Sequence, residues 1–387
     1  MGAQLSMYWT LCIQRGGPQR VNHAAVAIGS KIYTFSGYCS DHDMPQFTDV
    51  YCFDTIFLKW SKINYETTPE SPKACYGHSV VAYKHLVYLW GGQNITTASN
   101  ILYCFNTKTL SWSIPVTSGQ PPKPADGHSA CVIGDYMYIF GGFEDDIKSF
   151  SNKTYRINLT TFQWQTVHTT GCPPSKRDFH TASVIDNRMY IFGGRGIEES
   201  DVEYYHNEIM YLDTNSMKWS VPRKHARAPC GRRSHTAVVY KGEIYIIGGF
   251  DGINLKHLND TFKYNPVSDA WTEMKVQGKP PCPRRRHCSV VVEDILYLFG
   301  GSSPKNDADN RSFFSEGFIY LREHSDLFLL DFFPTLKKLA TINILENNID
   351  TNCLPSALQD EIKWIKSQPG YTYKRRGYSA FGLNLHS

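Results

Sequence analysis

Residues 125–142 read ADGHSACVIGDYMYIFGG, and the landmarks of this stretch recur along most of the chain. The apolar residues after His128 have the character of a buried inner strand. A second apolar run, residues 137–140, ends in the pair Gly141-Gly142, thirteen residues after the histidine. Glycine permits close backbone approach and a positive φ, so the pair is typical of a tightly packed strand end.

Six units share these landmarks. Their histidines lie 50 to 55 residues apart, at His23, His78, His128, His180, His235 and His287. Thirteen residues after each histidine comes a small pair: Ser36-Gly37, Gly91-Gly92, Gly141-Gly142, Gly193-Gly194, Gly248-Gly249 and Gly300-Gly301. A tryptophan closes five of the units, at Trp60, Trp112, Trp164, Trp219 and Trp271. A period near 50 residues with four short strands predicts a six-bladed propeller, in which each tryptophan is a wedge between adjacent sheets.

The sixth unit has no tryptophan after Gly301, but Trp9 stands alone at the other end of the chain. Trp9 precedes His23 by 14 residues, and each of the other five precedes the next histidine by 16 to 18. We therefore expect a strand around Trp9 to complete blade six. Such a strand would join the two ends of the propeller and remove two open sheet edges.

These landmarks resemble the kelch-repeat family over roughly residues 7–333. The predicted fold is all-β: a six-bladed kelch β-propeller at 7–333, closed by an N-terminal strand. A short α-helical segment at 334–365 follows, and then a tail at 366–387 that is polar and basic enough to be disordered. Each landmark histidine recurs at the same point of its own blade, so the six would form a ring too wide for one metal ion. We expect them to hydrogen-bond between strands, and we predict no metal and no cofactor.

Composition narrows the class of protein. The 387 residues are 41% hydrophobic and 14% aromatic, and the formal net charge is +4, which gives no reason to predict nucleic-acid or membrane-surface binding. Eleven cysteines without CxxC spacing favour reduced thiols in the cytoplasm or nucleus. No apolar stretch approaches the length of a membrane span. Residues 1–6 fit the short N-myristoylation pattern, which often occurs by chance, and Met7 is an alternative start.

Ligands of propellers bind at the mouth of the channel, on the loops that precede each histidine and follow each glycine pair. In blades four to six these loops carry Arg177, Arg195, Arg232, Arg233, Arg284, Arg285 and Arg286. In blades two and three they carry Tyr76, Asp126, Phe143, Glu144, Asp145 and Asp146. Opposed basic and acidic sectors suit a short peptide, whose carboxylate would pair with arginine in fork geometry.

We take nine of these loop residues as candidates for peptide binding. They are Asp126, Phe143, Arg177, Asp178, Arg195, Arg232, Arg233, Ser234 and Arg285. An arginine three residues before the histidine recurs in four blades, at Arg20, Arg177, Arg232 and Arg284, and such a repeated residue has an alternative role in the architecture. Arg195 and Arg233 break the repeat, so a structural role explains them less easily. The sequence has no paired carboxylates with an identifiable role, no nucleophile with a spaced base and no phosphate loop, and we therefore predict no enzyme.

The segment after Phe333 has apolar residues at helical spacing. Leu336, Ala340 and Ile344 resemble the box that docks substrate receptors on elongin C, although cysteine is commoner at the position of Ala340. Further on, a second set of residues resembles the cullin-2 box: Leu354, Pro355, Leu358 and Ile362. An apolar helix face laid in a groove of the partner would be the mode of binding. In the alternative interpretation, this stripe only packs on the propeller.

The repeat, the arginine loops and both boxes together resemble the kelch-domain substrate receptors of cullin-2 RING ubiquitin ligases. The resemblance implies a non-catalytic adaptor that binds C-terminal glycine degrons, with elongin B/C, cullin-2 and a RING subunit as partners, in the cytoplasm and nucleus. In one such receptor, an arginine directly after the fourth glycine pair helps to bind the terminal carboxylate, and Arg195 has that position here. That receptor has Ser-Trp where this chain has Arg233-Ser234, so we expect a pocket that differs in detail.

Two other functions stay open at this point. One is a kelch scaffold that binds cytoskeletal or chromatin proteins without a ligase. The other is a kelch-type enzyme, which would need metal ligands on the face that carries the arginine loops.

Overall fold

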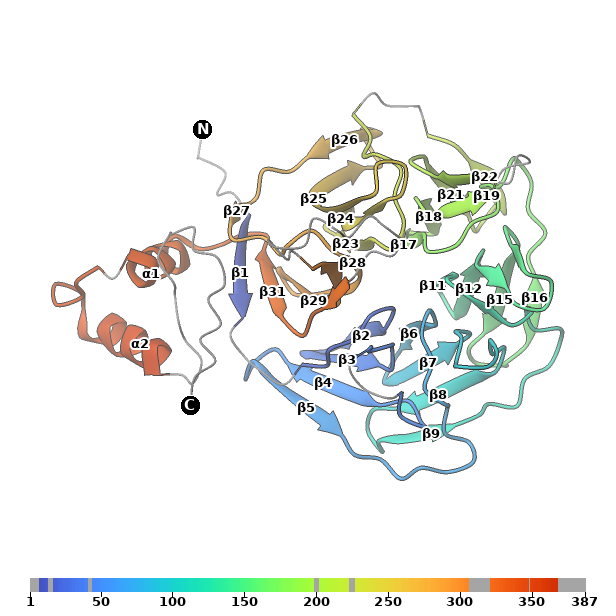
Figure 1. Ribbon diagram of the computed structural model, residues 1–387, viewed down its shortest axis with the longest axis horizontal. Helices are drawn as coiled ribbons and strands as arrows, with labels where there is room; N and C mark the ends of the chain where they lie inside the picture. The colour runs from blue at the N-terminus through green and yellow to red at the C-terminus, as the bar shows by residue number, and fades with distance from the viewer. Residues whose placement is uncertain are drawn as a thin grey trace.

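The computed structural model describes residues 7–12, 17–40, 44–197, 202–222, 227–305, 321–347 and 349–367. Within these residues, six sheets stand like blades around a central channel (Figure 1). The four main strands of each blade pair antiparallel, with the first strand at the channel and the fourth at the rim. The predicted kelch propeller is therefore confirmed.

The strands of the first three blades have the following bounds. Blade one contains β2 (Ala24–Ile28), β3 (Lys31–Phe35), β4 (Val50–Asp54) and β5 (Lys59–Ile63). Blade two contains β6 (Ser79–Tyr83), β7 (Leu86–Trp90), β8 (Leu102–Asn106) and β9 (Ser111–Ser113). Blade three contains β11 (Ser129–Ile133), β12 (Tyr136–Phe140), β15 (Thr154–Asn158) and β16 (Trp164–Thr166).

The other three blades follow the same plan. Blade four contains β17 (Thr181–Ile185), β18 (Arg188–Phe192), β21 (Ile209–Asp213) and β22 (Lys218–Ser220). Blade five contains β23 (Thr236–Tyr240), β24 (Glu243–Asp251), β25 (Lys256–Asn265) and β26 (Ala270–Glu273). Blade six contains β28 (Arg285–Val292), β29 (Ile295–Pro304), β31 (Leu327–Asp331) and β1 (Tyr8–Cys12).

The N-terminal strand closes the propeller as predicted. β1 pairs antiparallel with β31, with Trp9 opposite Leu330, and its other edge pairs in parallel with β27 (Gln277–Gly278). The indole of Trp9 is 2% exposed and packs with the core between blades five and six. The outermost strand of the last blade thus comes from the start of the chain, and the sheet edges at both ends are paired.

The tryptophans pack between neighbouring sheets, as their periodicity predicts. Trp219 lies 5.3 Å from Phe140 of the preceding blade, measured between ring centroids, and Trp271 lies 5.1 Å from Phe192. Both tryptophans are at least 95% buried. Because each aromatic contact crosses from one blade to the next, it holds the two sheets together through their side chains.

In the five units whose pair consists of two glycines, these glycines make room for two different histidines. A Cβ atom on Gly193, at φ 70°, would lie 2.6 Å from Cε1 of His235 in the next blade. A Cβ atom on Gly194, at φ 98°, would lie 2.8 Å from Cβ of His180 in its own blade. The first glycine is therefore needed for contact between blades, and the second for contact within one blade.

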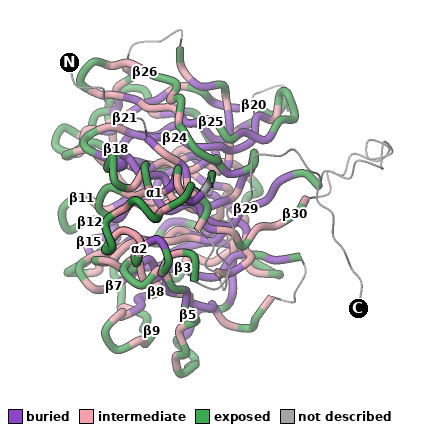
Figure 2. The backbone as a smooth tube through the Cα atoms, turned by 90° about the vertical axis from the view of Figure 1, so that its left-hand side faces the viewer, coloured by how far each residue is buried: buried purple, intermediate pink, exposed green. Residues whose placement is uncertain are grey.

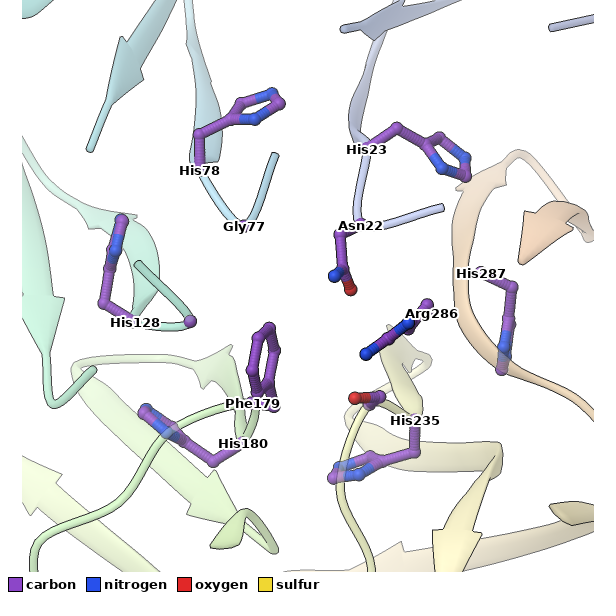
Figure 3. A pocket seen from close by; sticks show the side chains of 12 residues that line it. Asn22, His23, Gly77, His78, His128, Phe179, His180, His235, Arg286 and His287 are labelled. Atoms are coloured by element: carbon purple, nitrogen blue, oxygen red, sulfur yellow. The ribbon is translucent and has the colours of Figure 1, made fainter. Parts of the chain in front are cut away.

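The landmark histidines hydrogen-bond across the blades. Nε2 of four of them lies 2.8–3.2 Å from the hydroxyl that follows the histidine of the preceding blade, in the pairs Ser79–His128, Ser129–His180, Thr181–His235 and Thr236–His287. For His23 and His78 the corresponding residues are Cys288 and Ala24, which have no hydroxyl. The prediction of inter-strand hydrogen bonds is thus confirmed for four of the six. Figure 3 shows the imidazoles directed toward neighbouring blades and not toward the channel axis.

A ring of six backbone hydrogen bonds surrounds the channel mouth. The residue before each landmark histidine donates its N–H to the carbonyl of the equivalent residue in the preceding blade, over 2.7–3.1 Å. The ring runs through Asn22, Gly77, Gly127, Phe179, Ser234 and Arg286 and closes when Asn22 donates to Arg286. All six residues have left-handed backbones, with φ between 49° and 69°. That conformation costs a residue other than glycine roughly 1–2 kcal/mol.

Two helices follow the propeller and lie outside it, beside β1 (Figure 1). They are α1 (Leu336–Asn347) and α2 (Ser356–Ser367), and they confirm the predicted helical segment, although α2 ends two residues beyond the predicted boundary at 365. The rest of the predicted tail, residues 368–387, lies outside the described residues. Oγ1 of Thr335 accepts a hydrogen bond of 3.1 Å from the N–H of Lys338 and caps α1. Figure 2 views the molecule from the side of these helices, and both carry exposed residues there. Within the described residues, no helix has the length and apolar character that a membrane-spanning segment needs.

Alanine substitutions at two glycines test the role of the first glycine in the pair. Gly134 also has a left-handed backbone, φ 59°, but a Cβ atom there would meet nothing within 4 Å. We expect Gly134→Ala to cost about 1–2 kcal/mol of unfolding free energy, and Gly193→Ala to cost roughly 1–3 kcal/mol more because of the clash with His235. Urea denaturation measures both. Equal losses would mean that the imidazole does not require this glycine.

Candidate functional site

At the channel mouth, the loop before each histidine pairs with the loop after the glycine pair. Asp126 of β10 (Ala125–Asp126) lies opposite Phe143 of β13 (Phe143–Glu144). Asp178 lies opposite Arg195, at the start of β19 (Arg195–Ile197), and Arg233 lies opposite Phe250. The repeat thus brings predicted site residues side by side on one face, although they are 17 residues apart along the chain.

Three arginines lie close together in blades five and six, and two of them contact Phe250. Cζ of Arg285 lies 4.4 Å from the centroid of the Phe250 ring, and Cζ of Arg233 lies 5.5 Å from it. Arg286, the third, points into the channel mouth (Figure 3). Among the described residues, none of the three forms an ion pair with a carboxylate, and the buried Nε atom of each has no hydrogen-bond partner. We call Arg233, Arg285 and Arg286 the arginine cluster.

The arginines of this cluster repel one another. Burial and the charges of Arg286 and Arg233 lower the pKa of Arg285 to about 9. Burial and the charges of Arg233 and Arg195 lower the pKa of Arg286 to about 10. Both side chains are still cations at neutral pH. Glu323 offsets part of the charge of Arg286, and Asp178 and Glu203 offset part of that of Arg233, but none of the described carboxylates forms a close ion pair with the cluster. An anion bound among them would relieve that repulsion.

Two further buried polar groups lie beside the cluster. His257 is 5% exposed and its Nε2 atom has no partner, while Ser302 is 1% exposed and its hydroxyl has none. Burial and the nearby cluster lower the pKa of His257 to about 4, so this imidazole is neutral. Ser302 lies opposite Arg285 in the β28–β29 pairing. Two unsatisfied polar groups therefore lie beside the positive charge.

Arg195, in contrast, already has two acidic partners. Its Nε and Nη2 atoms donate to both carboxylate oxygens of Asp178, over 3.1 and 2.9 Å, and Nη1 donates to Glu203 over 2.9 Å. Asp178 is 1% exposed, so this bidentate pair is shielded from water. Three of the five guanidinium N–H groups of Arg195 are thus already engaged, and its charge is offset by two carboxylates.

Arg177 and Arg232 were expected to contact a ligand, and that expectation was wrong. Both are 0% exposed, and each donates from Nη1 to the carbonyl of the first glycine in the pair of its own blade. Arg177 donates to Gly193 over 2.9 Å, and Arg232 donates to Gly248 over 3.0 Å. Their other nitrogens reach further loop groups, among them the carboxylates of Glu208 and Asp260. The arginine that recurs three residues before the histidine therefore ties loops together.

The acidic sector is smaller than the sequence suggests. Asp145 forms an ion pair with Lys148 and accepts a hydrogen bond of 3.3 Å from the N–H of Ala98. Asp126 lies at the channel side, where burial and the charge of Asp178 raise its pKa to about 7. Phe143 packs edge-on against Phe150, with 5.3 Å between the ring centroids. Of the predicted acids, Asp126 has the best position to face a ligand.

One constellation in blade four looks catalytic but has another explanation. Oγ of Ser175 lies 3.4 Å from Nε2 of His206, and Nδ1 of His206 lies 3.3 Å from the carboxylate of Glu208. That carboxylate is also the ion-pair partner of the buried Arg177. The group thus belongs to the support of a structural arginine. Within the described part of the chain, no cluster of three metal-ligating side chains occurs.

The helices expose part of the predicted boxes. Leu336 is 72% exposed, Ala340 is exposed and Ile344 is half-buried, so one face of α1 carries an apolar stripe toward solvent. In the second box, Pro355 is exposed, and Leu354 and Leu358 are half-buried. Ile362 was expected on the docking surface, but it is 2% exposed. It is an inward anchor of α2, and this part of the prediction was wrong.

Four residues at the arginine cluster are not among the nine candidates chosen from the sequence, although Arg286 was placed in the basic sector. Phe250 and Ser302 directly follow the glycine pairs of blades five and six, and Arg286 directly precedes His287, so the repeat gave a signal for all three. His257 had no such signal, because it reaches the pocket from β25, far from either landmark. Only the return of the β24–β25 hairpin brings it there.

These features define the protein as a closed kelch-type β-propeller with a cationic pocket at one channel mouth. The model of the KLHDC2/KLHL20/DRC7 kelch-repeats domain matches residues 77–301, and the kelch motif matches residues 19–65. The chain therefore belongs to the kelch-repeat family, as predicted.

Curated relatives share most of its length. Kelch domain-containing protein 3 of Homo sapiens is 42% identical over 369 residues, which cover 92% of this chain and 94% of the human protein. The protein of the same name from Bos taurus has the same identity and coverage. Host cell factor 2 of Homo sapiens is 30% identical over 265 residues, or 64% of this chain and 33% of that protein. The similarity to the first two extends beyond the blades into the helical segment.

Proposed function

We propose that this chain is the substrate-recognition subunit of a cullin-2–elongin B/C RING ubiquitin ligase. Its propeller binds the C-terminal glycine of target proteins, and its helices bind the ligase. The observation that carries the proposal is the arginine cluster: three cations at the channel mouth with no carboxylate partner among the described residues. As an adaptor, the chain has no catalytic role of its own.

A free C-terminus suits this pocket for two reasons. Its carboxylate can accept two parallel hydrogen bonds from a guanidinium, and such charge-assisted bonds are stronger than neutral ones. No residue follows the C-terminal carboxylate of a peptide. The carboxylate can therefore enter a partly buried site that has no room for a continuing chain. Arg285 is 8% exposed and Phe250 is 4% exposed, so the site is largely shielded from water as well as cationic.

The carboxylate is therefore assigned to Arg233, Arg285 and Arg286, and Arg195 receives a supporting role. In its pair with Asp178, Arg195 forms the wall between the arginine cluster and Asp126. Ser234, which lines the channel mouth beside Arg286, offers a hydroxyl without a partner. The family resemblance, not the geometry, points to glycine as the last residue.

The helices support the ligase half of the proposal. The stripe Leu336–Ala340–Ile344 faces away from the buried residues Ile342 and Leu345 of the same helix. An apolar face that the chain leaves exposed is the feature that a partner groove requires. The absence of disulfides among the described cysteines suits the cytoplasm and nucleus, where we place the complex.

Binding of a glycine-ended peptide and its C-terminal amide tests recognition of the carboxylate. We expect the amide to bind roughly 10- to 100-fold more weakly, because a hydrogen bond to a charged group contributes about 1.5–3 kcal/mol. Arg285→Gln should weaken binding of the acid and leave binding of the amide nearly unchanged. Fluorescence polarisation with labelled peptides measures all four affinities.

Arg188→Gln is the matched control, because Arg188 lies in the β17–β18 hairpin at the opposite face, with 46% of its side chain exposed. It should change neither affinity. Equal affinities of the acid and the amide for the unsubstituted protein would refute carboxylate recognition.

Co-purification with elongin B/C tests the helical stripe and separates the ligase from a plain kelch scaffold. We expect Leu336→Asp to abolish co-purification, because it places a charge in an apolar interface. Val116→Asp adds the same charge to an aliphatic residue that is 93% exposed on the propeller, and it should have no effect. If the unsubstituted protein does not retain elongin B/C, or if Leu336→Asp retains it fully, the scaffold function is favoured.

A further inference from the structure

Phe179 occupies a position in the channel ring that does not suit a bulky residue. Its φ is 49°, in the left-handed region where a large side chain is a genuine outlier. Two equivalent ring positions have glycine, Gly77 and Gly127, and a third has Asn22. Its N–H and carbonyl make the same ring hydrogen bonds as theirs, so the backbone does not require phenylalanine.

Packing does not require this phenylalanine either. Its side chain is only half-buried and belongs to none of the apolar clusters between the blades. Its ring end lies against Gly127, where a Cβ atom would be 3.4 Å from Cζ of Phe179. Figure 3 shows the ring directed into the channel mouth, on the opposite side from Arg286. Strained residues of this kind cluster at functional sites.

Its place in the ring connects Phe179 to both sectors of the site. Its carbonyl accepts a hydrogen bond of 2.9 Å from the N–H of Ser234, whose own carbonyl accepts one of 2.9 Å from Arg286. On its other side stands Asp178, the partner of Arg195. Phe179 therefore lies between the arginine cluster and Asp126.

The space beside Phe179 is small. Phe179, Ser234 and Arg286 help to line a cavity of about 120 Å³ at the channel mouth. Toward blades two and three the cavity is lined by His78 and His128 and by the ring residues Gly77 and Gly127, which have no side chain, whereas in blade four the ring residue contributes the phenyl group of Phe179. Phe179 contributes the one apolar side chain among the described residues that line this cavity.

We infer that Phe179 is a specificity-determining residue, which walls the pocket for the last residue of the peptide and restricts that residue to glycine. The inference rests on the proposed function, because it concerns the same bound C-terminus. It adds a cause for the choice of glycine that the arginine cluster cannot supply, since a guanidinium binds the carboxylate of any amino acid equally.

Peptides that differ only in the last residue test the inference. We expect the unsubstituted protein to bind a glycine-ended peptide at least about tenfold more tightly than the alanine-ended one, since one methyl group in a closed pocket is worth roughly 10- to 200-fold. In Phe179→Gly, the two affinities should come within about threefold of each other, mainly through tighter binding of the alanine-ended peptide. Isothermal titration calorimetry measures each pair.

Two further variants keep the test sharp. Phe179→Asn places in blade four the residue that blade one has at this position, and it replaces Phe179→Gly if that variant does not fold. It should bring the affinities for the glycine-ended and alanine-ended peptides closer together. Glu293→Gly is the matched control: it relieves an equally left-handed backbone, φ 55°, in an exposed turn between β28 and β29, away from the channel mouth. It should leave the preference for glycine unchanged.

The outcomes separate the two proposals. If the unsubstituted protein prefers glycine and the Phe179 variants keep the full preference, the wall is refuted and carboxylate recognition stands. If the unsubstituted protein binds none of the free C-termini, the proposed function is refuted, and so is the specificity role of Phe179.

Discussion

Six backbone hydrogen bonds close the propeller around its channel, and each requires a left-handed residue directly before a landmark histidine. Closure fixes where the loops at the channel mouth stand, because each loop donates to the one before it and accepts from the one after. The glycine pairs then bring the second strands against those histidines. With the backbone held in this way, side chains of the same loops are free to vary from blade to blade.

That division between fixed backbone and variable side chains is clearest in the triplets before the histidines. In blade five, Arg232 is fully buried and paired with Asp260, while its neighbour Arg233 faces the channel mouth without a carboxylate. In blade six, Arg284 pairs with Asp326, while Arg285 and Arg286 add their charges to the cluster. Neighbouring arginines thus have different roles. In each of these two loops, one arginine forms an ion pair that holds the loop in place, and the arginines without an ion pair create a site for an anion.

The sequence predicts the fold well, because its landmarks are local and repeated. The period, the histidine-to-glycine spacing and the lone Trp9 are sufficient for six blades and their closure. It predicts the site less well. The spacing of Arg177, Arg232 and Arg284 before the histidines is equally compatible with contact to a ligand. Their structural role becomes visible only through their ion pairs with carboxylates from distant loops, namely Glu208, Asp260 and Asp326. Arg195 breaks the repeat, but Asp178 and Glu203 neutralise it. Ile362 fits a docking motif, but α2 needs it as an inward anchor.

The most direct test is a crystal structure of the propeller with a bound peptide that ends in glycine. The account predicts that the terminal carboxylate oxygens lie about 2.7–2.9 Å from guanidinium nitrogens of Arg233, Arg285 or Arg286, while Arg195 keeps its bidentate pair with Asp178. A carboxylate bound by Arg195 in place of Asp178, or a peptide that leaves the arginine cluster empty, would contradict it.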